Sequence, residues 1–148
     1  MQSFNLYSGF TVQSSRFDEV QEFNEKRFFR SPDAYGFINF YWEFAKNSCM
    51  AVSGNYTGKM LVPYFGTETD PDIGELRESD SFFDMGIKLR QDFRLNGATM
   101  RLFGGIKNIF NSYQSDFDIG VDRDPGYIYG PLSPRTIYIG VKFGNLSF

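Results

Sequence analysis

The sequence predicts an all-β protein built from about six antiparallel strands. Three observations favour this fold class: several stretches alternate apolar with polar residues, aromatic residues make up 19% of the chain, and long and short connections follow one another in turn. Alternation with a period of two gives a strand one apolar and one polar face. Phe and Tyr, of which the chain has 18 and 9, are more common in strands than in helices.

The first three predicted strands cover residues 4–12, 35–45 and 50–62. In each strand most apolar side chains fall on alternate positions, as the second strand shows with Ile38, Phe40, Trp42 and Phe44. Residues 46–49 form a short turn between the second and third strands. This interpretation places the only cysteine, Cys49, in a turn, where it has no second thiol with which to form an internal disulfide.

The last three predicted strands cover residues 82–93, 100–110 and 135–143. The fourth strand alternates most regularly, because apolar residues at 83, 85, 87, 89 and 93 alternate with charged residues at 84, 88, 90 and 92. Asn96 and Gly97 supply the positive φ values of a type I′ turn, which predicts a hairpin between the fourth and fifth strands. Residues 144–148 follow the sixth strand as a short tail that ends on Phe148.

Three long connections, residues 13–33, 63–80 and 111–134, alternate with the two short turns. Compact soluble domains seldom contain three structureless connections of about 18 to 24 residues. An up-and-down transmembrane β-barrel has short periplasmic turns and long extracellular loops, and strands of about 9 to 13 residues are long enough to cross a bilayer. The alternative is a soluble sandwich or a lipocalin-like barrel, with the apolar face inside. Periodicity does not distinguish the two arrangements.

Composition excludes several classes of function. The chain has no histidine, and no serine or cysteine lies in a setting typical of a nucleophile, so we predict no enzyme activity, no histidine-bound metal and no cofactor. The net charge of −3 gives no basic surface for nucleic acid. No apolar run is long enough for a transmembrane helix, and residues 1–7 lack the features of a signal peptide. We therefore expect a cytoplasmic protein, a mature chain or a fragment.

Two motifs near the end of the sequence resemble a known family. Residues 104–114, GGIKNIFNSYQ, are similar to the G-x-K-N-L-F-N stretch on the penultimate strand of TonB-dependent outer-membrane receptors. Residues 129–131, YGP, and 134–143, PRTIYIGVKF, are similar to the family's Y-G-P and P-R-x-x-Y-x-G-x-K-F ending. Residues 31–36 and 55–60 also resemble family signatures, so that the resemblance extends over most of the chain.

The resemblance implies the C-terminal portion of a receptor, residues 1–148, with the plug domain absent. Members of the family form 22-stranded barrels in the outer membrane of Gram-negative bacteria and take up scarce nutrients such as ferric siderophores or cobalamin. The implied partners are the lipid bilayer, the missing plug and remaining barrel strands, and the TonB complex, which acts through the absent N-terminal part. A small lipocalin-like or outer-membrane barrel that binds a hydrophobic ligand is the second hypothesis.

Candidate ligand-binding residues lie in two of the long connections. Arg27, Phe28, Phe29 and Arg30 combine basic and aromatic side chains, which suit an anionic ring-bearing ligand, although aromatic packing between loops would explain them equally well. Asp116 and Asp118, with Asp122 and Asp124, could bind Ca²⁺ or be solvated turn residues, and their spacing does not match an EF-hand. The second connection is acidic, with six carboxylates and one arginine, Arg77, and we interpret it as a solvated external loop.

A second set of charged residues lies on the polar sides of the fourth and fifth predicted strands. In a barrel these side chains would face the lumen and pair with one another or with a plug. They are Asp84, Lys88, Arg90, Asp92, Arg101 and Lys107.

Overall fold

A computed structural model describes residues 3–70 and 72–144, and the predicted all-β class is confirmed. Six antiparallel strands form one sheet in the order β1-β2-β3-β6-β7-β8. A second, two-stranded sheet pairs β4 with β5. The strands are β1 (Ser3–Val12), β2 (Ala34–Ala45), β3 (Ser48–Thr57), β4 (Leu61–Tyr64), β5 (Glu75–Glu78), β6 (Phe82–Leu95), β7 (Ala98–Lys107) and β8 (Thr136–Gly144), with one short 3-10 helix, η1 (Glu22–Asn24).

The alternating pattern separates the six-stranded sheet into two chemically different faces. The register aligns the apolar positions of all six strands. What we call the apolar face consists of Phe4, Leu6, Phe10, Ile38, Phe40, Trp42, Met50, Val52, Phe83, Met85, Ile87, Leu89, Met100, Leu102, Ile106, Ile137, Ile139, Val141 and Phe143. Many of these side chains are exposed: Ile139 is 80% and Phe4 70% accessible.

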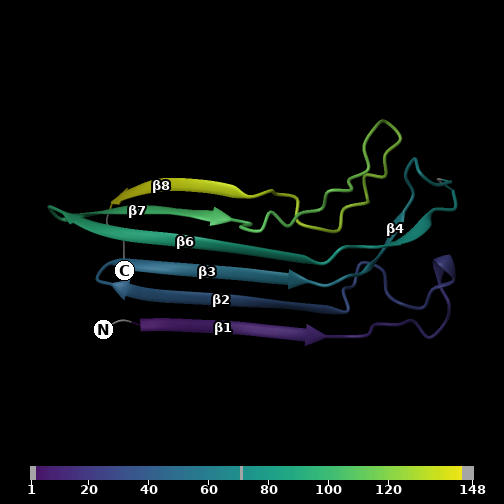
Figure 1. Cartoon of the computed structure of the whole chain (residues 1–148), viewed down its shortest axis with the longest axis horizontal. Coiled ribbons are helices and arrows are strands. Elements are labelled where there is room, and N and C mark those ends of the chain that lie inside the picture. The colour runs from purple at the N-terminus through teal and green to yellow at the C-terminus, as the bar shows by residue number, and fades with distance from the viewer. Residues whose placement is uncertain (1–2, 71, 145–148) are drawn as a thin grey trace.

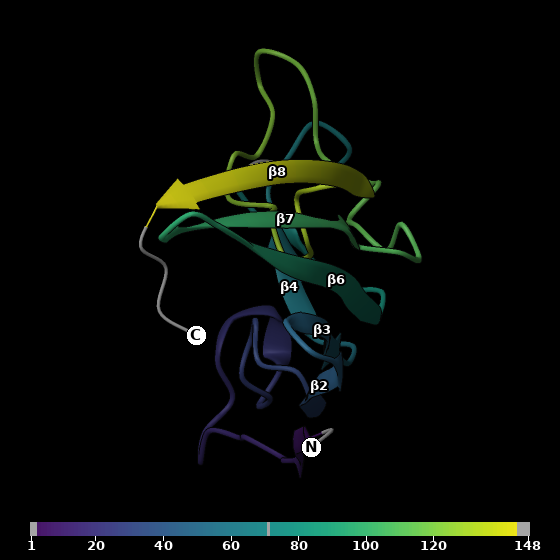
Figure 2. The same cartoon turned by 90° about the vertical axis from the view of Figure 1, so that its left-hand side faces the viewer.

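The opposite side, which we call the polar face, carries the charged and hydroxyl-bearing residues. They include Tyr7, Asn39, Tyr41, Ser53, Asp84, Lys88, Arg90, Asp92, Arg101, Lys107, Tyr138 and Lys142. A flat six-stranded sheet would hold its edge strands about 24 Å apart, five spacings of about 4.8 Å. Tyr7 of β1 and Tyr138 of β8 nevertheless line one hollow on this face. The sheet is therefore concave on its polar side, and Figure 2 shows it bent and twisted rather than flat.

Within the described residues the six-stranded sheet is open, with β1 and β8 as its two edges. The two short turns lie at one end of the sheet and the three long connections at the other (Figure 1). Asn96 and Gly97 have φ values of 42° and 89°, which confirms the positive φ values expected of the β6–β7 turn. The part of the chain that the structure describes contains no helix long and apolar enough to cross a membrane.

Two predicted boundaries and one predicted turn are wrong. The third strand does not continue to residue 62. It ends at Thr57, where its pairing with β2 ends, because Leu61 and the residues after it pair with β5 instead. The fifth strand ends at Lys107, since Asn108 adopts a positive φ of 48°. Cys49 is buried in β3, and the left-handed Asn47 makes the preceding turn.

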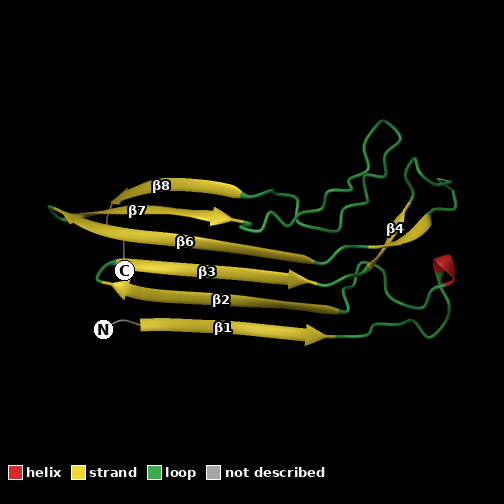
Figure 3. Ribbon diagram, viewed as in Figure 1, coloured by secondary structure: helices red, strands yellow, loops and turns green. Residues whose placement is uncertain are grey.

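The second long connection is also less irregular than the sequence predicts. Residues that we assigned to the third strand and to a structureless loop form the β4–β5 hairpin, in which Leu61 pairs with Glu78 and Tyr64 with Glu75 (Figure 3). The Gly144 end of β8 is described, whereas Phe148 and the rest of the predicted tail lie outside the described residues.

Candidate functional site

The three long connections contact one another and form a folded cap at one end of the sheet, which we call the loop cap (residues 13–33, 58–81 and 108–135). Arg30 joins the first connection to the third, because its Nη2 donates to the carbonyl oxygen of Gly126 at 2.7 Å and its Nη1 to that of Ile128 at 3.2 Å. Asp124 joins the third to the second by accepting a hydrogen bond from the Phe65 N–H at 3.0 Å. The connections are therefore folded segments held to one another.

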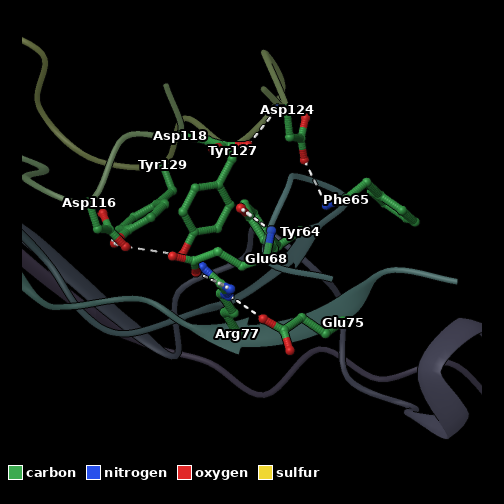
Figure 4. Close-up of polar contacts among 10 residues, drawn as sticks. All are labelled: Tyr64, Phe65, Glu68, Glu75, Arg77, Asp116, Asp118, Asp124, Tyr127 and Tyr129. Atoms are coloured by element: carbon green, nitrogen blue, oxygen red, sulfur yellow. Dashed lines mark hydrogen bonds and ion pairs between the residues drawn. The ribbon is translucent and has the colours of Figure 1, made fainter. Parts of the chain in front are cut away.

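The loop cap has its own hydrophobic core, formed by Met60, Val62, Tyr64 and Tyr127. Tyr64 and Tyr127 meet edge to face with ring centroids 4.8 Å apart. Arg77 of β5 lies over the Tyr64 ring, 3.6 Å from its centroid (Figure 4). Most of the buried hydrophobic side chains of the described chain belong to this region, since the sheet leaves its apolar face uncovered.

Arg77 also organises part of the acidic second connection. Its guanidinium donates hydrogen bonds to Glu75 and, at 2.8 Å, to Glu68. Burial opposes the charge of Arg77, but the hydrogen bonds to Glu75, Glu68 and Tyr127 outweigh it and raise the pKa of Arg77 above its ordinary value. Lys59 likewise pairs with Glu78 at 2.7 Å, and this hydrogen bond lowers the pKa of Glu78. Several of the acidic side chains in this connection thus have local cationic partners.

Two of the predicted ligand-binding residues, Asp116 and Asp118, accept hydrogen bonds from other residues of the loop cap. The Asp116 carboxylate accepts hydrogen bonds from the Tyr127 hydroxyl at 3.1 Å and the Tyr129 hydroxyl at 2.6 Å. Burial raises the pKa of both tyrosines, and the Asp116 carboxylate raises each further. Asp118 accepts from the backbone N–H of Asp124 at 2.7 Å. Across the described ranges, no group of three or more potential ligands lies close enough to hold a metal ion.

The aromatic residues of the first connection line an open hollow of about 340 Å³. Its walls are Phe17, Phe28 and Phe29 with Gln21 and Glu22. Phe17 and Phe28 pack with ring centroids 4.3 Å apart, and Phe28 remains 40% exposed. Arg27 pairs with Glu25 at 3.4 Å, whereas Arg30 is engaged by the third connection. Of the four predicted residues, Phe28 and Phe29 line the hollow.

The predicted lumen-facing residues do share the polar face, but they differ in their partners. Asp92 is fully buried and forms two hydrogen bonds with Arg101, at 2.7 Å and 2.9 Å. Arg90 lies 3.8 Å from the same carboxylate. Lys88 and Lys107 instead line a hollow of about 310 Å³ with three tyrosines. Within residues 3–70 and 72–144, none of these charged residues forms an ion pair with a carboxylate of the loop cap.

Three residues that hold the third connection were missed by the sequence prediction. Asn108 donates to the carbonyl oxygens of Ser112 and Ser133 at 3.0 Å and 2.9 Å, and Asn111 accepts from the Arg135 N–H at 2.9 Å. The side chain of Gln114 is 1% exposed and forms hydrogen bonds with the backbone of residues 127, 129 and 130. The two asparagines belong to the family-like KNIFN stretch and have positive φ values, a conformation that asparagine tolerates well. That preference is the signal that could have identified them.

Comparison with protein-family models, curated proteins and solved structures found no match for this chain. The family resemblance of the C-terminal motifs therefore stays a prediction that rests on the motif residues themselves.

Proposed function

We propose that this chain is part of an outer-membrane receptor of the TonB-dependent type, which takes up a scarce nutrient such as a ferric siderophore or cobalamin. The main support for the proposal is that the apolar face of the sheet is on its convex side and the polar face on its concave side. Apolar side chains cover the convex side of the sheet and are exposed, whereas charges and hydroxyls line the concave side. A sheet that forms part of a membrane barrel needs this arrangement, because lipid surrounds the outside and water fills the lumen.

The ends of the strands support the same proposal. Short turns at one end and a folded loop cap at the other are typical of a barrel with periplasmic turns and extracellular loops. Further strands beyond β1 and β8 would satisfy the edge N–H and C=O groups, which lipid cannot do. In this arrangement Phe28 and Phe29, with the nearby Arg27, would meet the external ligand first.

One observation favours the second candidate, a barrel that binds a hydrophobic ligand. The apolar face contains a hollow of about 350 Å³ whose lining includes Phe10, Ile38, Gly54, Tyr56 and Phe83. A ligand held there would cover part of the exposed apolar surface. In a lipocalin-like barrel, however, the apolar face would have to be concave, and here the polar face is.

The experiment is a labelling scan along β8 of the full gene product in the cell envelope. In a Cys49→Ser background, single cysteines replace Ile137 and Ile139 on the apolar face, and Tyr138 and Lys142 on the polar face, and each carries an environment-sensitive dye. We expect brominated lipids to quench the dye at 137 and 139, and aqueous iodide to quench it at 138 and 142. Recovery of the folded protein in the soluble fraction, or iodide quenching at all four positions, would refute membrane insertion.

Transport needs its own measurement. Cells with and without the gene are supplied with radiolabelled ferric chelates or cobalamin, with and without a protonophore. Receptor function predicts uptake that requires both the gene and the proton gradient. Membrane insertion without energised uptake of any of these cargoes would leave the topology intact and refute the proposed transport role for them.

A further inference from the structure

The hollow on the polar face is built from two neighbouring cross-strand rows. One row runs Tyr41, Ala51, Lys88, Gly105 and Tyr138 from β2 to β8. The other runs Tyr7, Asn39, Ser53 and Gly86, and Lys107 follows beside Gly86. In the first row the small residues Ala51 and Gly105 lie on either side of Lys88, and in the second row Ser53 and Gly86 are small. The face is therefore hollowed beside the lysine to about 310 Å³.

Gly105 is necessary for this shape. A Cβ at Gly105 would lie 2.3 Å from the carbonyl oxygen of Ile87 and 2.8 Å from the hydroxyl oxygen of Tyr138. Tyr138 therefore extends its hydroxyl over Gly105, from the edge strand toward β6. An aromatic ring thereby forms one wall of the hollow, beside the lysine that faces Gly105 across the β6–β7 pair, Lys88.

The charge in the hollow is cationic and uncompensated. Lys88 and Lys107 form no ion pair within 4.0 Å in the described part of the chain, whereas Arg101, Lys59 and Arg77 all have carboxylate partners. The two lysines lie near rings instead: the Lys88 Nζ is 5.1 Å from the centroid of Phe103, and the Lys107 Nζ is 5.8 Å from that of Tyr138. They are diagonal neighbours across β6 and β7, close enough for both ammonium groups to reach one anion.

We infer that this hollow binds a small aromatic carboxylate. Its volume lies at the lower end of the range for small-molecule sites, which combine an apolar lining with a few polar groups. The carboxylate would accept charge-assisted hydrogen bonds from Lys88 and Lys107. The ring would pack against Tyr138 and Tyr7, and Asn39 and Ser53 would hydrogen-bond to ring substituents. The site lies on the concave polar face and does not require insertion into a membrane, so it goes beyond the proposed transport role.

The test titrates the full-length protein with naphthoate and follows the fluorescence of the probe. Lys88→Gln and Lys107→Gln should each weaken binding at least about tenfold, because each removes one charged donor. Lys142→Gln is the matched control, since Lys142 lies on the same face without lining the hollow, and it should bind naphthoate like the wild type. Naphthalenemethanol, which has the same ring and no charge, should bind at least about tenfold more weakly than naphthoate.

Ala51→Phe tests the contribution of the hollow's shape separately from that of its charge. This substitution fills the floor while both lysines remain, and it should abolish binding, with circular dichroism confirming that the sheet is retained. Absence of saturable naphthoate binding up to about 1 mM would overturn the inference. Equal binding of naphthoate and the alcohol, or equal binding by the wild type and both lysine variants, would overturn it as well. Protection of the two lysines from acylation by an acidic polypeptide, without naphthoate binding, would assign the hollow to that polypeptide and overturn the small-molecule site.

Discussion

Replacement of Gln114 by alanine should release the third connection of the loop cap. The Gln114 side chain is 1% exposed; its Nε2 donates to the carbonyl oxygen of Tyr127 at 3.0 Å. Its Oε1 accepts from the N–H groups of Tyr129 at 2.9 Å and Gly130 at 3.3 Å. One buried amide thus holds three backbone groups that have to stay in place for Tyr127 and Tyr129 to reach Asp116.

The magnitude follows from these contacts. Three hydrogen bonds at about 1 kcal/mol net each give a local destabilisation of about 3 kcal/mol. Because about 1.4 kcal/mol corresponds to a factor of ten, the amides of Tyr129 and Gly130 should exchange with solvent roughly 150-fold faster. The effect should remain within the loop cap, since the strand hydrogen bonds of the sheet do not involve Gln114.

Hydrogen exchange measured by mass spectrometry on peptides that cover residues 124–131 tests this expectation. Gln21→Ala is the matched control, because Gln21 is an exposed glutamine whose amide donates only to the carbonyl oxygen of Glu19 among the hydrogen bonds of the described chain. It should leave the exchange of residues 124–131 unchanged. If Gln114→Ala altered that exchange by less than about twofold, the Gln114 amide would not be the group that holds the third connection.

Three other expectations concern separate contacts. Gly66→Ala should undock the second connection and speed its cleavage by protease, because the new Cβ would lie 1.9 Å from the Asp118 carboxylate oxygen; wild-type cleavage kinetics would contradict this. Asp92→Ala should lower the free energy of unfolding by about 1.5 to 3 kcal/mol in a denaturant titration, because the partly exposed Arg101 loses its charge-assisted hydrogen bonds, and a loss below about 1 kcal/mol would contradict it. The pKa of Tyr129 is raised by burial and by its carboxylate partner, so its stabilising effect should be complete below the ordinary tyrosine pKa of about 10 and be lost as pH rises beyond it. Hydrogen exchange of the loop cap should accelerate at that pH in the wild type and less so in Tyr129→Phe; equal acceleration in both would refute the assignment.

The main strands could be predicted because alternation is a local property. The register of β6 against β3 and β7 places Ile87 opposite Val52 and Ile106, as a shared apolar face requires. The end of β3 could not be predicted, since residues 59–62 continue the alternating pattern. Residues 61–64 pair with residues 75–78 instead of continuing β3, and that pairing forms only on folding.

For the candidate sites, too, the positions of the residues could be predicted, whereas their partners could not. The sequence identified the charged positions of the polar face, but not that Asp92 pairs with Arg101 while Lys88 and Lys107 have no carboxylate within 4.0 Å in the described residues. The sequence identified Asp116 as a candidate ligand-binding residue. In the structure its carboxylate accepts hydrogen bonds from the hydroxyls of Tyr127 and Tyr129. Such pairings depend on segments that meet only after folding.

The all-β class, the two faces of each strand and the alternation of short and long connections are encoded locally, because they follow from backbone periodicity and turn chemistry. The concave polar face and the cap with its own core, which the long connections form, are seen only in the folded chain. Periodicity is the same for a sheet bent in either direction. The direction of bending depends on twist and register summed over all six strands, and the loop cap depends on contacts such as that of Arg30 with Gly126, between residues far apart in the chain.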